Sequence, residues 1–382
     1  MFTVDLHRHF EAGLRPETIA RLAGRHRVTE ARTRAGATIP GIDPQDPESI
    51  RRYYRSIAAG FGGLDGFPRF VDSFGLPLSV LRSPEDLEQA VFEQLVDCAV
   101  GGDLHTELRG SPFTYLENIR GPEVSFGASG PDVPGHGVPL RDLEEIAAAL
   151  AAGVDRAWRE RSVSGTFVLA FSRQKGKQQA RLVAELAARL HRADRPVGLD
   201  IAGFPETTYP PRSFVEALQP AREAGVPVTV HAGEQGGFPD FAQASPALVV
   251  EAVEHLGARR IGHGTSLAAS PAARILMRER GIGIECCPVS NQCMGFVPVR
   301  RHPLRLFLQE GLLASLATDD PLMFGRFSVR ETFRAIGEPL RLTAADLLRM
   351  TRNGIDTAFV TDQRREWLRG RLNAHLAEGA ML

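Results

Sequence analysis

The sequence has few cysteines and almost no excess of charge. Its four cysteines show no Cys-x-x-Cys spacing, so neither a disulfide framework nor a cysteine zinc site is indicated. A reducing, cytoplasmic compartment fits that usage best. A formal net charge of −1 gives no general attraction to phosphate backbones or anionic lipid. We therefore expect no nucleic-acid partner and no membrane surface.

Long apolar runs and several enzyme signatures are also missing. No apolar stretch of about 18 residues occurs, so no membrane-spanning helix is predicted. There is no HExxH helix, no PCxxC to accompany an HxE, no GxSxG elbow and no P-loop. These absences argue against zincin proteases, small cytidine-type deaminases, α/β-hydrolases and P-loop enzymes. The 43% hydrophobic and 24% charged content is ordinary for a globular protein with a sizeable core.

Strand-like and helical patterns alternate along most of the chain. The strand-like runs are residues 2–7, 104–108, 165–171, 197–202, 226–230, 260–262, 281–286 and 312–317. Helical patterns, for example 178–190 and 246–256, lie between most of them. Eight strand–helix units are the number that a closed parallel barrel needs. We predict an α/β fold, a (β/α)8 TIM barrel, formed by residues 1–382 as one domain.

Two regions do not fit a simple alternation. Roughly ninety residues separate the first strand-like run from the second, far more than a usual connection. Within them Ser83 precedes Pro84 and an acidic pair, which predicts the start of a helix. We expect a helical insertion after the first strand, which could cover a site. Extra helices are predicted at the C-terminal end, one of them opened by a capping-box-like start at Thr343 and Asp346.

Polar residues gather at the C-terminal ends of the predicted strands. They are His7, His9, His231, Glu234, His263, Asp319 and Asp320. Barrels of this kind build their active sites at that end, from several different strands. Side chains two apart on a strand share a face, so His7 and His9 can point at one target. Singly, His263 could be a turn histidine and Asp319-Asp320 a helix start. Their joint position is what indicates a site.

Three neutral imidazoles and one carboxylate make a suitable site for Zn²⁺ with a place left for water. The predicted ligands of one Zn²⁺ per chain are His7, His9, His231 and Asp319. The metal could lower the pKa of its bound water from about 15.7 to about 7, giving a metal-bound hydroxide. Glu234 and His263 would remain as acid/base and orienting groups, and Asp320 would be free to bind substrate. Cys286, Cys287 and Cys293 are predicted to be packing residues.

The stretches around these residues resemble the adenosine deaminase family of the amidohydrolase superfamily. The matching pieces, in the family's order, are Leu6-His7-Arg8-His9, Leu14-Arg15-Pro16-Glu17, His231-Ala232-Gly233-Glu234, Arg260-Ile261-Gly262-His263-Gly264, Cys287-Pro288-Val289-Ser290-Asn291 and Thr318-Asp319-Asp320-Pro321. They span nearly the whole chain, and the His-Ala-Gly-Glu and Thr-Asp-Asp-Pro pieces are specific when found together. The resemblance implies a (β/α)8 barrel with one catalytic metal, usually zinc, that removes a 6-amino group from a purine by hydrolysis.

Carried over by position, the resemblance implies the same four metal ligands. Glu234 would protonate ring N1 as water adds at C6. His263 would orient and stabilise the attacking hydroxide, with Asp319 as the proton acceptor. Asp320 would hydrogen-bond N7, and Gly203 would offer its backbone N–H to N3, where a side chain would obstruct the ring. The implied partner is therefore a small purine; the sequence indicates no oligomeric state.

Two departures from the family pattern leave the substrate open. Phe10-Glu11-Ala12-Gly13 stands where adenosine deaminases commonly have Leu-Asp-Gly, whose Asp contacts the ribose side. Glu11 there resembles the adenine deaminase branch, whereas Gly262-His263-Gly264 and Thr318-Asp319 look more like the nucleoside branch. We predict deamination of adenosine, or a close adenine nucleoside, to the 6-oxo product. Adenine or 6-aminodeoxyfutalosine is the alternative substrate; another amidohydrolase reaction or a non-catalytic purine-binding protein is the remoter alternative.

Overall fold

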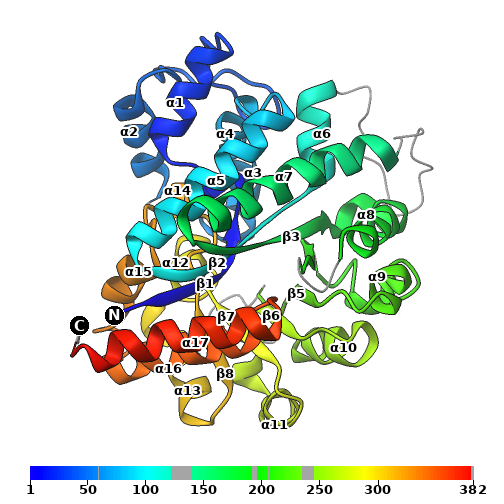
Figure 1. Ribbon diagram of the computed structural model, residues 1–382, viewed down its shortest axis with the longest axis vertical. Coiled ribbons are helices and arrows are strands. Elements are labelled where there is room, and N and C mark those ends of the chain that lie inside the picture. The colour runs from blue at the N-terminus through cyan, green and yellow to red at the C-terminus, as the bar shows by residue number, and fades with distance from the viewer. Residues whose placement is uncertain (59, 122–139, 192–195, 205, 235–244, 380–382) are drawn as a thin grey trace.

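The computed structural model describes residues 1–58, 60–121, 140–191, 196–204, 206–234 and 245–379. Eight parallel strands follow one another in the sheet in chain order, each paired with the next (Figure 1). They are β1 (Thr3–His9), β2 (Asp103–Gly110), β3 (Ser164–Ser172), β4 (Gly198–Ala202), β5 (Val228–Ala232), β6 (Arg260–His263), β7 (Gly283–Cys286) and β8 (Leu313–Leu316). A parallel bridge between Arg8 and Asp319 brings the end of β8 back to β1. The predicted (β/α)8 barrel is confirmed.

The strands could be read from the sequence because the barrel buries both of their faces. Every residue of β5 is buried and most of β3 is, and parallel strands covered in this way appear as short runs rich in apolar residues. The observed strand ends lie within a few residues of the predicted ones. β1 extends further than predicted, to His9, because its last residues pair with Asp319. The N–H of His9 donates to the Asp319 carbonyl at 2.9 Å, and the N–H of Asp319 donates to the His7 carbonyl at 2.8 Å.

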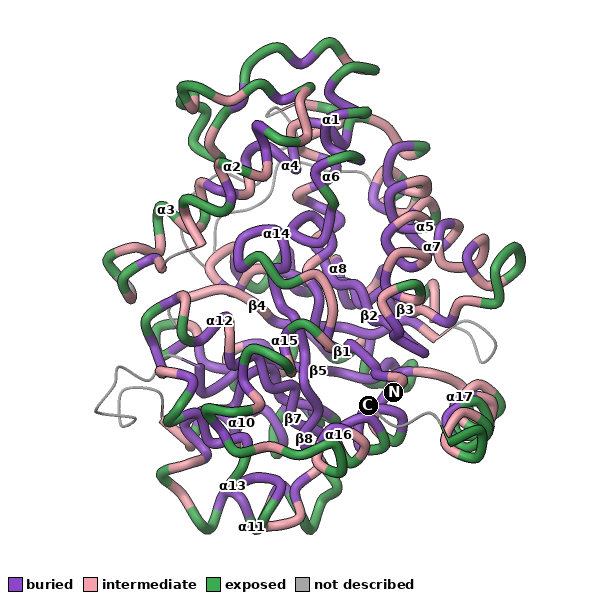
Figure 2. The backbone as a smooth tube through the Cα atoms, turned by 90° about the vertical axis from the view of Figure 1, so that its left-hand side faces the viewer, coloured by how far each residue is buried: buried purple, intermediate pink, exposed green. Residues whose placement is uncertain are grey.

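The predicted insertion after β1 is helical. Its helices are α1 (Pro16–Arg25), α2 (Pro47–Ile57), α3 (Phe67–Ser73), α4 (Gly75–Ser79) and α5 (Pro84–Gly101). The predicted start of α5 is confirmed, since the Ser83 hydroxyl accepts a hydrogen bond from the N–H of Asp86 at 3.2 Å. Figures 1 and 2 show α1 to α4 gathered at one end of the barrel. The insertion is therefore a cap on that end.

The remaining helices surround the strands and close the chain. Those between strands are α6 (Pro112–Arg120), α7 (Leu140–Arg161), α8 (Gly176–Leu190), α9 (Gln219–Glu223), α10 (Pro246–Leu256), α11 (Pro271–Glu279), α12 (Pro288–Cys293) and α13 (Leu304–Gln309). After β8 come α14 (Pro321–Phe324), α15 (Val329–Ile336), α16 (Ala344–Thr357) and α17 (Asp362–Ala377). The predicted capping box opens α16, with Thr343 and Asp346 bonded reciprocally. Leu368 and Leu372 of α17 pack with Val4 and Leu6 of β1.

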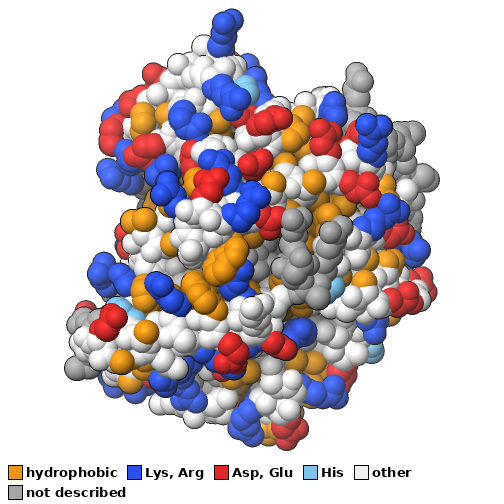
Figure 3. Space-filling model, in the orientation of Figure 1, with side chains coloured by type: hydrophobic (Ala, Val, Ile, Leu, Met, Phe, Trp, Pro, Cys, Tyr) orange, Lys and Arg blue, Asp and Glu red, His pale blue; other side chains and the backbone are white. Residues whose placement is uncertain are grey.

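Burial follows this architecture. In Figure 2 the buried segments are the strands at the centre, and exposed segments lie at the ends and outer faces of the helices. On the face shown in Figure 3, basic and acidic side chains are interspersed, in keeping with the net charge of −1. Within the described ranges, no helix is long and apolar enough to cross a membrane.

Candidate active site

The four side chains predicted to bind metal meet at the C-terminal end of the barrel. His7 and His9 come from β1, His231 from β5, and Asp319 lies just after β8. The Nε2 atoms of His7 and His9 lie 3.3 and 3.4 Å from Asp319 Oδ1. The Nε2 atoms of His9 and His231 are 3.3 Å apart, and one ligand atom from each of the four lies within 4.8 Å of the others. A tetrahedral ion with bonds of about 2.0–2.1 Å needs ligand atoms about 3.3 Å apart, so the spacing suits one ion.

The chemistry of these donors also suits a metal ion. The Nε2 atom of His7 is buried and has no hydrogen-bond partner among the described residues. Burial lowers the pKa of His9 to about 3 and lowers the pKa of His231, so both imidazoles are neutral and keep a lone pair. Burial alone would raise the pKa of Asp319, but the charge of the nearby His7 ring holds it well below its ordinary value. Burial and the charge of Arg109 would lower the pKa of His7, but Asp319 and Glu285 raise it above its ordinary value, so an ion bound at Nε2 would take the place of a proton. The neutral rings of His9 and His231 with the ionised Asp319 fit Zn²⁺.

Two residues of the cluster have a strained backbone conformation. His263 and Asp319 both have φ of 64°, in the left-handed region that residues other than glycine rarely adopt. His263 is the last residue of β6, and Asp319 is held by its backbone hydrogen bonds to β1. The side chains at these two positions lie in the same cluster, with His263 Nε2 3.8 Å from Asp319 Oδ2.

Buried carboxylates orient two of the histidines predicted to bind metal. The Nδ1 atom of His7 lies 2.7 Å from Glu285 Oε2, and the Nδ1 atom of His231 lies 3.0 Å from Asp200 Oδ2. Arg109 joins the two carboxylates, at 2.8 Å from Glu285 and 3.1 Å from Asp200. Because each Nδ1–H is held by a carboxylate, the Nε2 lone pair of each ring is directed to the metal position.

This charge network continues into the barrel interior and was not predicted from the sequence. The Arg260 Nε atom lies 2.6 Å from Glu285 Oε1, and Arg260 also pairs with the buried Glu107. A signal was present, because Asp200 and Glu285 are acids inside otherwise apolar strands, Gly-Leu-Asp-Ile-Ala and Gly-Ile-Glu-Cys. An acid at such a position must be paired, since burying an unpaired charge is costly. Its partners, however, come from other strands.

Glu234 lies beside the predicted metal-binding cluster as a neutral acid. Its side chain is buried, and burial raises its pKa well above the ordinary value, with the negative charges of Asp319 and Glu206 adding to the shift. Glu206 also fixes the backbone, since its carboxylate accepts hydrogen bonds from the N–H groups of Gly233 at 2.7 Å and Glu234 at 3.0 Å. Gly233 has φ of 71°, and a Cβ there would lie 2.2 Å from Ser266 Oγ. The turn before Glu234 therefore requires glycine.

His263 lies between Glu234 and Asp319. Burial lowers its pKa well below the ordinary value, so the ring is neutral. Its Nδ1 atom is 3.3 Å from Glu234 Oε1 and 3.1 Å from Asn291 Nδ2. Asn291 belongs to one of the matching pieces of sequence, but no role was predicted for it. Six of the seven strand-end residues singled out in the sequence thus contact one another in one cluster. The seventh, Asp320, directly follows Asp319 in the chain.

A cavity of about 100 Å³ opens beside this cluster. Its described lining consists of His9, Phe67, Phe70, Phe74, Ala202, Gly203, Phe204, His231, Glu234, His263, Ser290, Met294, Asp319 and Asp320. Two of the three predicted substrate contacts, Gly203 and Asp320, are among these residues. Phe67 and Phe70 belong to α3, so the insertion after β1 covers the site, as expected. The cavity is therefore polar on the metal side and aromatic on the side of the cap.

The predicted substrate contacts differ in their surroundings. Burial raises the pKa of Asp320 well above the ordinary value, and the charge of Asp319 adds to it, so Asp320 is a neutral donor. Gly203 has φ of 90°, and a Cβ there would lie 2.3 Å from Gln174 Oε1. Glu11 is not among the described residues that line the cavity. Its carboxylate accepts a hydrogen bond from the Tyr115 hydroxyl at 2.7 Å, and only 9% of the residue is exposed.

The cysteines near the site are buried thiols. Cys286 lies in the hydrophobic core, and Cys287 is buried with its Sγ atom 3.6 Å from the Glu285 carbonyl. Cys287 also lies close enough to His7, His263 and Asp319 to be considered as a ligand. Burial raises the pKa of the Cys287 thiol well above its ordinary value, and metals bind the thiolate. The set with three histidines and Asp319 is therefore the better metal site.

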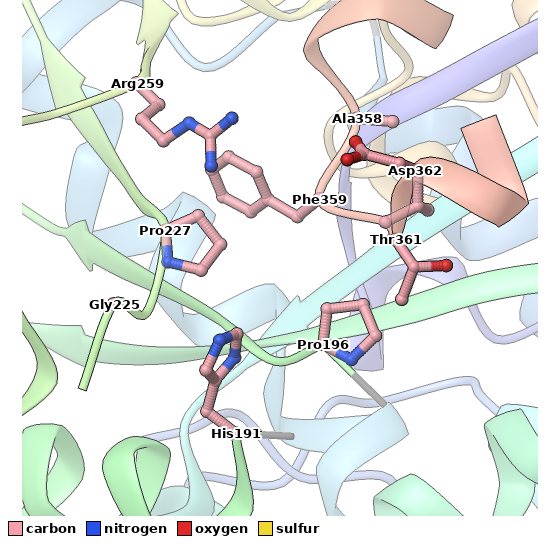
Figure 4. Close-up of a pocket in the computed structure, with 10 residues that line it drawn as sticks. His191, Pro196, Gly225, Pro227, Arg259, Ala358, Phe359, Thr361 and Asp362 are labelled. Atoms are coloured by element: carbon pink, nitrogen blue, oxygen red, sulfur yellow. The ribbon is translucent and has the colours of Figure 1, made fainter. Parts of the chain in front are cut away.

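A second cavity, of about 300 Å³, lies at the opposite end of the barrel (Figure 4). Pro196, Pro227 and Arg259 line it, and these residues stand just before β4, β5 and β6. It therefore opens at the N-terminal ends of the strands, away from the cluster of histidines. In barrels of this type that end serves stability and the other end serves catalysis.

Comparisons with known proteins agree with this picture. A family model described as adenosine deaminase matches residues 3–375. The adenosine deaminase of Shewanella loihica is 29% identical over 366 residues, which is 96% of each chain. That of Pectobacterium atrosepticum is 28% identical over 368 residues, covering 96% of this chain and 94% of the relative.

Two solved structures share the fold. The adenine deaminase of Arthrobacter aurescens has a TM-score of 0.76 at 24% identity, covering 98% of this chain and 99% of its own. A zinc-bound amidohydrolase from Burkholderia ambifaria has a TM-score of 0.74 at 23% identity, covering 99% of this chain and 91% of its own. At these identities the likeness concerns the barrel and its cap.

Proposed function

The chain belongs to the adenosine deaminase family, and we propose that it removes the 6-amino group of an adenine nucleoside by hydrolysis. In this reaction, water adds at C6 of adenosine, ammonia leaves, and inosine is the product. The single observation that carries the proposal is the cluster of four metal-binding side chains with Glu234 and His263 around one cavity. A protein that only bound purines would have no need of a buried neutral acid beside a metal position.

The donor set fits one Zn²⁺ ion, which His7, His9, His231 and Asp319 would hold. When bound, the ion would supply Lewis-acid activation of a water molecule at neutral pH. The paired carboxylates Asp200 and Glu285 keep two of the histidine rings in the required tautomer, so the protein arranges the donors before the ion arrives.

The protein's own groups handle the protons. N1 of an adenine ring accepts a proton as C6 becomes tetrahedral, and Glu234, which is neutral in its buried position, supplies it. His263 is neutral and orients the water at C6. Asp320, also neutral, donates a hydrogen bond to N7, which has only a lone pair to offer. The N–H of Gly203 serves N3 in the same way.

The aromatic part of the cavity suits the flat faces of a purine. Phe67, Phe70 and Phe74 come from the cap, and Phe204 comes from the loop after β4. Aromatic rings bury the base and exclude water, which strengthens the hydrogen bonds to its edge.

Adenine is the second candidate substrate, and one observation favours it. Apart from the clustered histidines and acids, the described lining residues offer one polar side chain, the hydroxyl of Ser290. Glu11, at the position expected to meet the ribose, is already bonded to Tyr115. The described part of the cavity therefore offers a ribose few hydrogen-bonding partners.

A panel assay on metal-defined protein tests the proposal and separates the substrates. Adenosine, adenine and 6-aminodeoxyfutalosine are compared by kcat/KM, using the loss of adenine absorbance and the release of ammonia. We expect turnover of at least one of them, with the highest value for a nucleoside. An absence of turnover on every adenine compound would refute the deaminase proposal. A clear preference for adenine would replace the nucleoside by the free base.

The purine partner, the single-domain organisation and the cytoplasmic compartment stay predictions. The compartment rests on cysteine usage, and the four cysteines are free thiols in the structure.

A further inference from the structure

We propose that His302 and Asn291 form a positioning pair that sets the protons of Glu234 and His263 on the atoms where the reaction needs them. The inference rests on the proposed function for its kinetic consequences. Neither residue has a role predicted from the sequence, and His302 lies 11 positions beyond Asn291 along the chain. The pair is not part of the metal-binding set.

The first step is the tautomer of His302. Its Nδ1 atom accepts a hydrogen bond from the N–H of Leu304 at 3.2 Å, so the ring proton is on Nε2. Nε2 lies 3.2 Å from Asn291 Oδ1 and therefore donates to it. The ring is buried, and burial lowers the pKa of His302 to about 3. It stays neutral and keeps this single arrangement at any pH where the enzyme would work.

The second step is the orientation of the Asn291 amide. Because Oδ1 accepts from His302, the Nδ2 group faces the active site, 3.3 Å from Glu234 Oε1 and 3.1 Å from His263 Nδ1. Asn291 is fully buried. Its backbone carbonyl accepts hydrogen bonds from the N–H groups of Phe296 at 2.9 Å and Val297 at 3.1 Å, which fixes the position of the residue. If the amide were flipped, Oδ1 would face the acceptors Glu234 Oε1 and His263 Nδ1, and Nδ2 would face the Nε2–H donor of His302. The hydrogen bond from His302 therefore prevents that orientation.

The third step is the effect on the two reacting groups. One amide N–H bonds Glu234 Oε1, so the proton of the neutral carboxyl is on Oε2, the oxygen left for the purine. The other N–H bonds His263 Nδ1, so the proton of that neutral ring is on Nε2, the nitrogen 3.8 Å from Asp319 Oδ2. A single amide thus places both protons, and His302 holds the amide.

The kinetic test compares His302→Phe with His302→Gln in the metal-loaded protein. Phenylalanine keeps the size of the ring and removes the donor, so kcat should fall about tenfold, the factor expected for one lost orienting hydrogen bond. KM and bound metal should stay close to the wild-type values. Glutamine can donate from its amide nitrogen to Asn291 Oδ1 and should restore most of kcat. Asn291→Leu removes both N–H groups and should cost kcat about 10²-fold.

Asn353→Leu is the matched control. Asn353 of α16 is also buried, and its amide donates to the carbonyls of Ala314 at 2.9 Å and Leu312 at 3.5 Å, away from the cavity. The Asn353→Leu substitution should lower the melting temperature while leaving kcat per folded molecule unchanged. The inference is overturned if His302→Phe keeps full kcat, if glutamine restores nothing, or if Asn353→Leu reduces kcat as much as His302→Phe does.

A second readout does not need turnover. Nitrogen NMR of protein labelled in its histidine rings, with His263 assigned from its absence in His263→Gln, should find the His263 proton on Nε2. In Asn291→Leu that preference should be lost. A His263 proton found on Nδ1 in the wild-type protein overturns the inference. If no adenine compound is turned over, the proposed function fails by itself, and this measurement still decides the positioning role.

Discussion

Glu234→Gln is the substitution that tests the chemistry most directly. Burial raises the pKa of Glu234, so the wild-type side chain is neutral, and glutamine has nearly the same shape and charge. Glutamine can keep its oxygen toward the Asn291 amide, which now lies 3.3 Å from Glu234 Oε1. The predicted metal ligands are unchanged in this variant. What the change removes is the proton that N1 would receive.

The expected loss can be bounded from that single missing function. General acid/base catalysis by one positioned group contributes about 10²–10⁴-fold, so kcat should fall by at least about 10², while KM stays within a few fold. Metal content should equal that of the wild type, as measured by atomic absorption on dialysed protein. Glu160→Gln, at an exposed position on α7 that pairs with Arg156, is the control and should keep full activity.

Two results would refute this reasoning. Near-normal kcat in Glu234→Gln would remove Glu234 from the role of acid. A loss of bound metal in the same variant would mean that Glu234 acts through the metal site. A large fall in kcat with intact metal content supports the assignment.

Three further predictions concern pH, metal and shape. Because the pKa of Glu234 is raised, its side chain binds a proton more tightly in the folded wild-type protein than in the unfolded chain. The proton therefore stabilises the folded state. This stabilisation is complete below the pKa of Glu234 in the unfolded chain and is lost as pH rises toward its pKa in the folded protein. Apo Glu234→Gln should therefore gain stability relative to the apo wild type as pH rises from about 4 to 8 in denaturant titrations, whereas equal pH dependence would contradict the shift. Removal of the metal with a chelator should abolish turnover and lower the melting temperature, and added Zn²⁺ should restore both; activity that survives complete removal would exclude the predicted His7, His9, His231 and Asp319 site. Gly203→Ala should raise KM and destabilise the protein by about 1–3 kcal/mol, because φ is 90° and the new Cβ would meet Gln174, and unchanged kinetics would argue against close approach of the ring.

The main elements of the fold could be predicted from the sequence because their causes are local. Strands such as β3 and β5, which the barrel covers on both faces, appear as short runs rich in apolar residues, and helix starts such as Ser83 and Thr343 carry their own capping residues. The strand-end residues could be grouped for a topological reason. In a closed parallel barrel all C-terminal strand ends lie at one rim, so residues as distant as His7 and Asp319 are brought together by the fold class alone.

The tertiary structure decided the partners. Glu285 is an acid in an apolar strand, yet only the register of the barrel brings it to His7, Arg109 and Arg260. Glu11 meets Tyr115, which lies 104 residues later, and this contact, with the cavity beside it, now bears on the choice between a nucleoside and a free base.

The same division holds for the residues at the centre of the chemistry. The sequence by itself determined that histidines and acids occupy the strand ends, since residue type and strand period are local properties. Only the packed structure decided which of them are neutral and where their protons lie. Burial, neighbouring charge and hydrogen bonds such as those of Asn291 and His302 arise from segments that meet in space, and no local pattern encodes them.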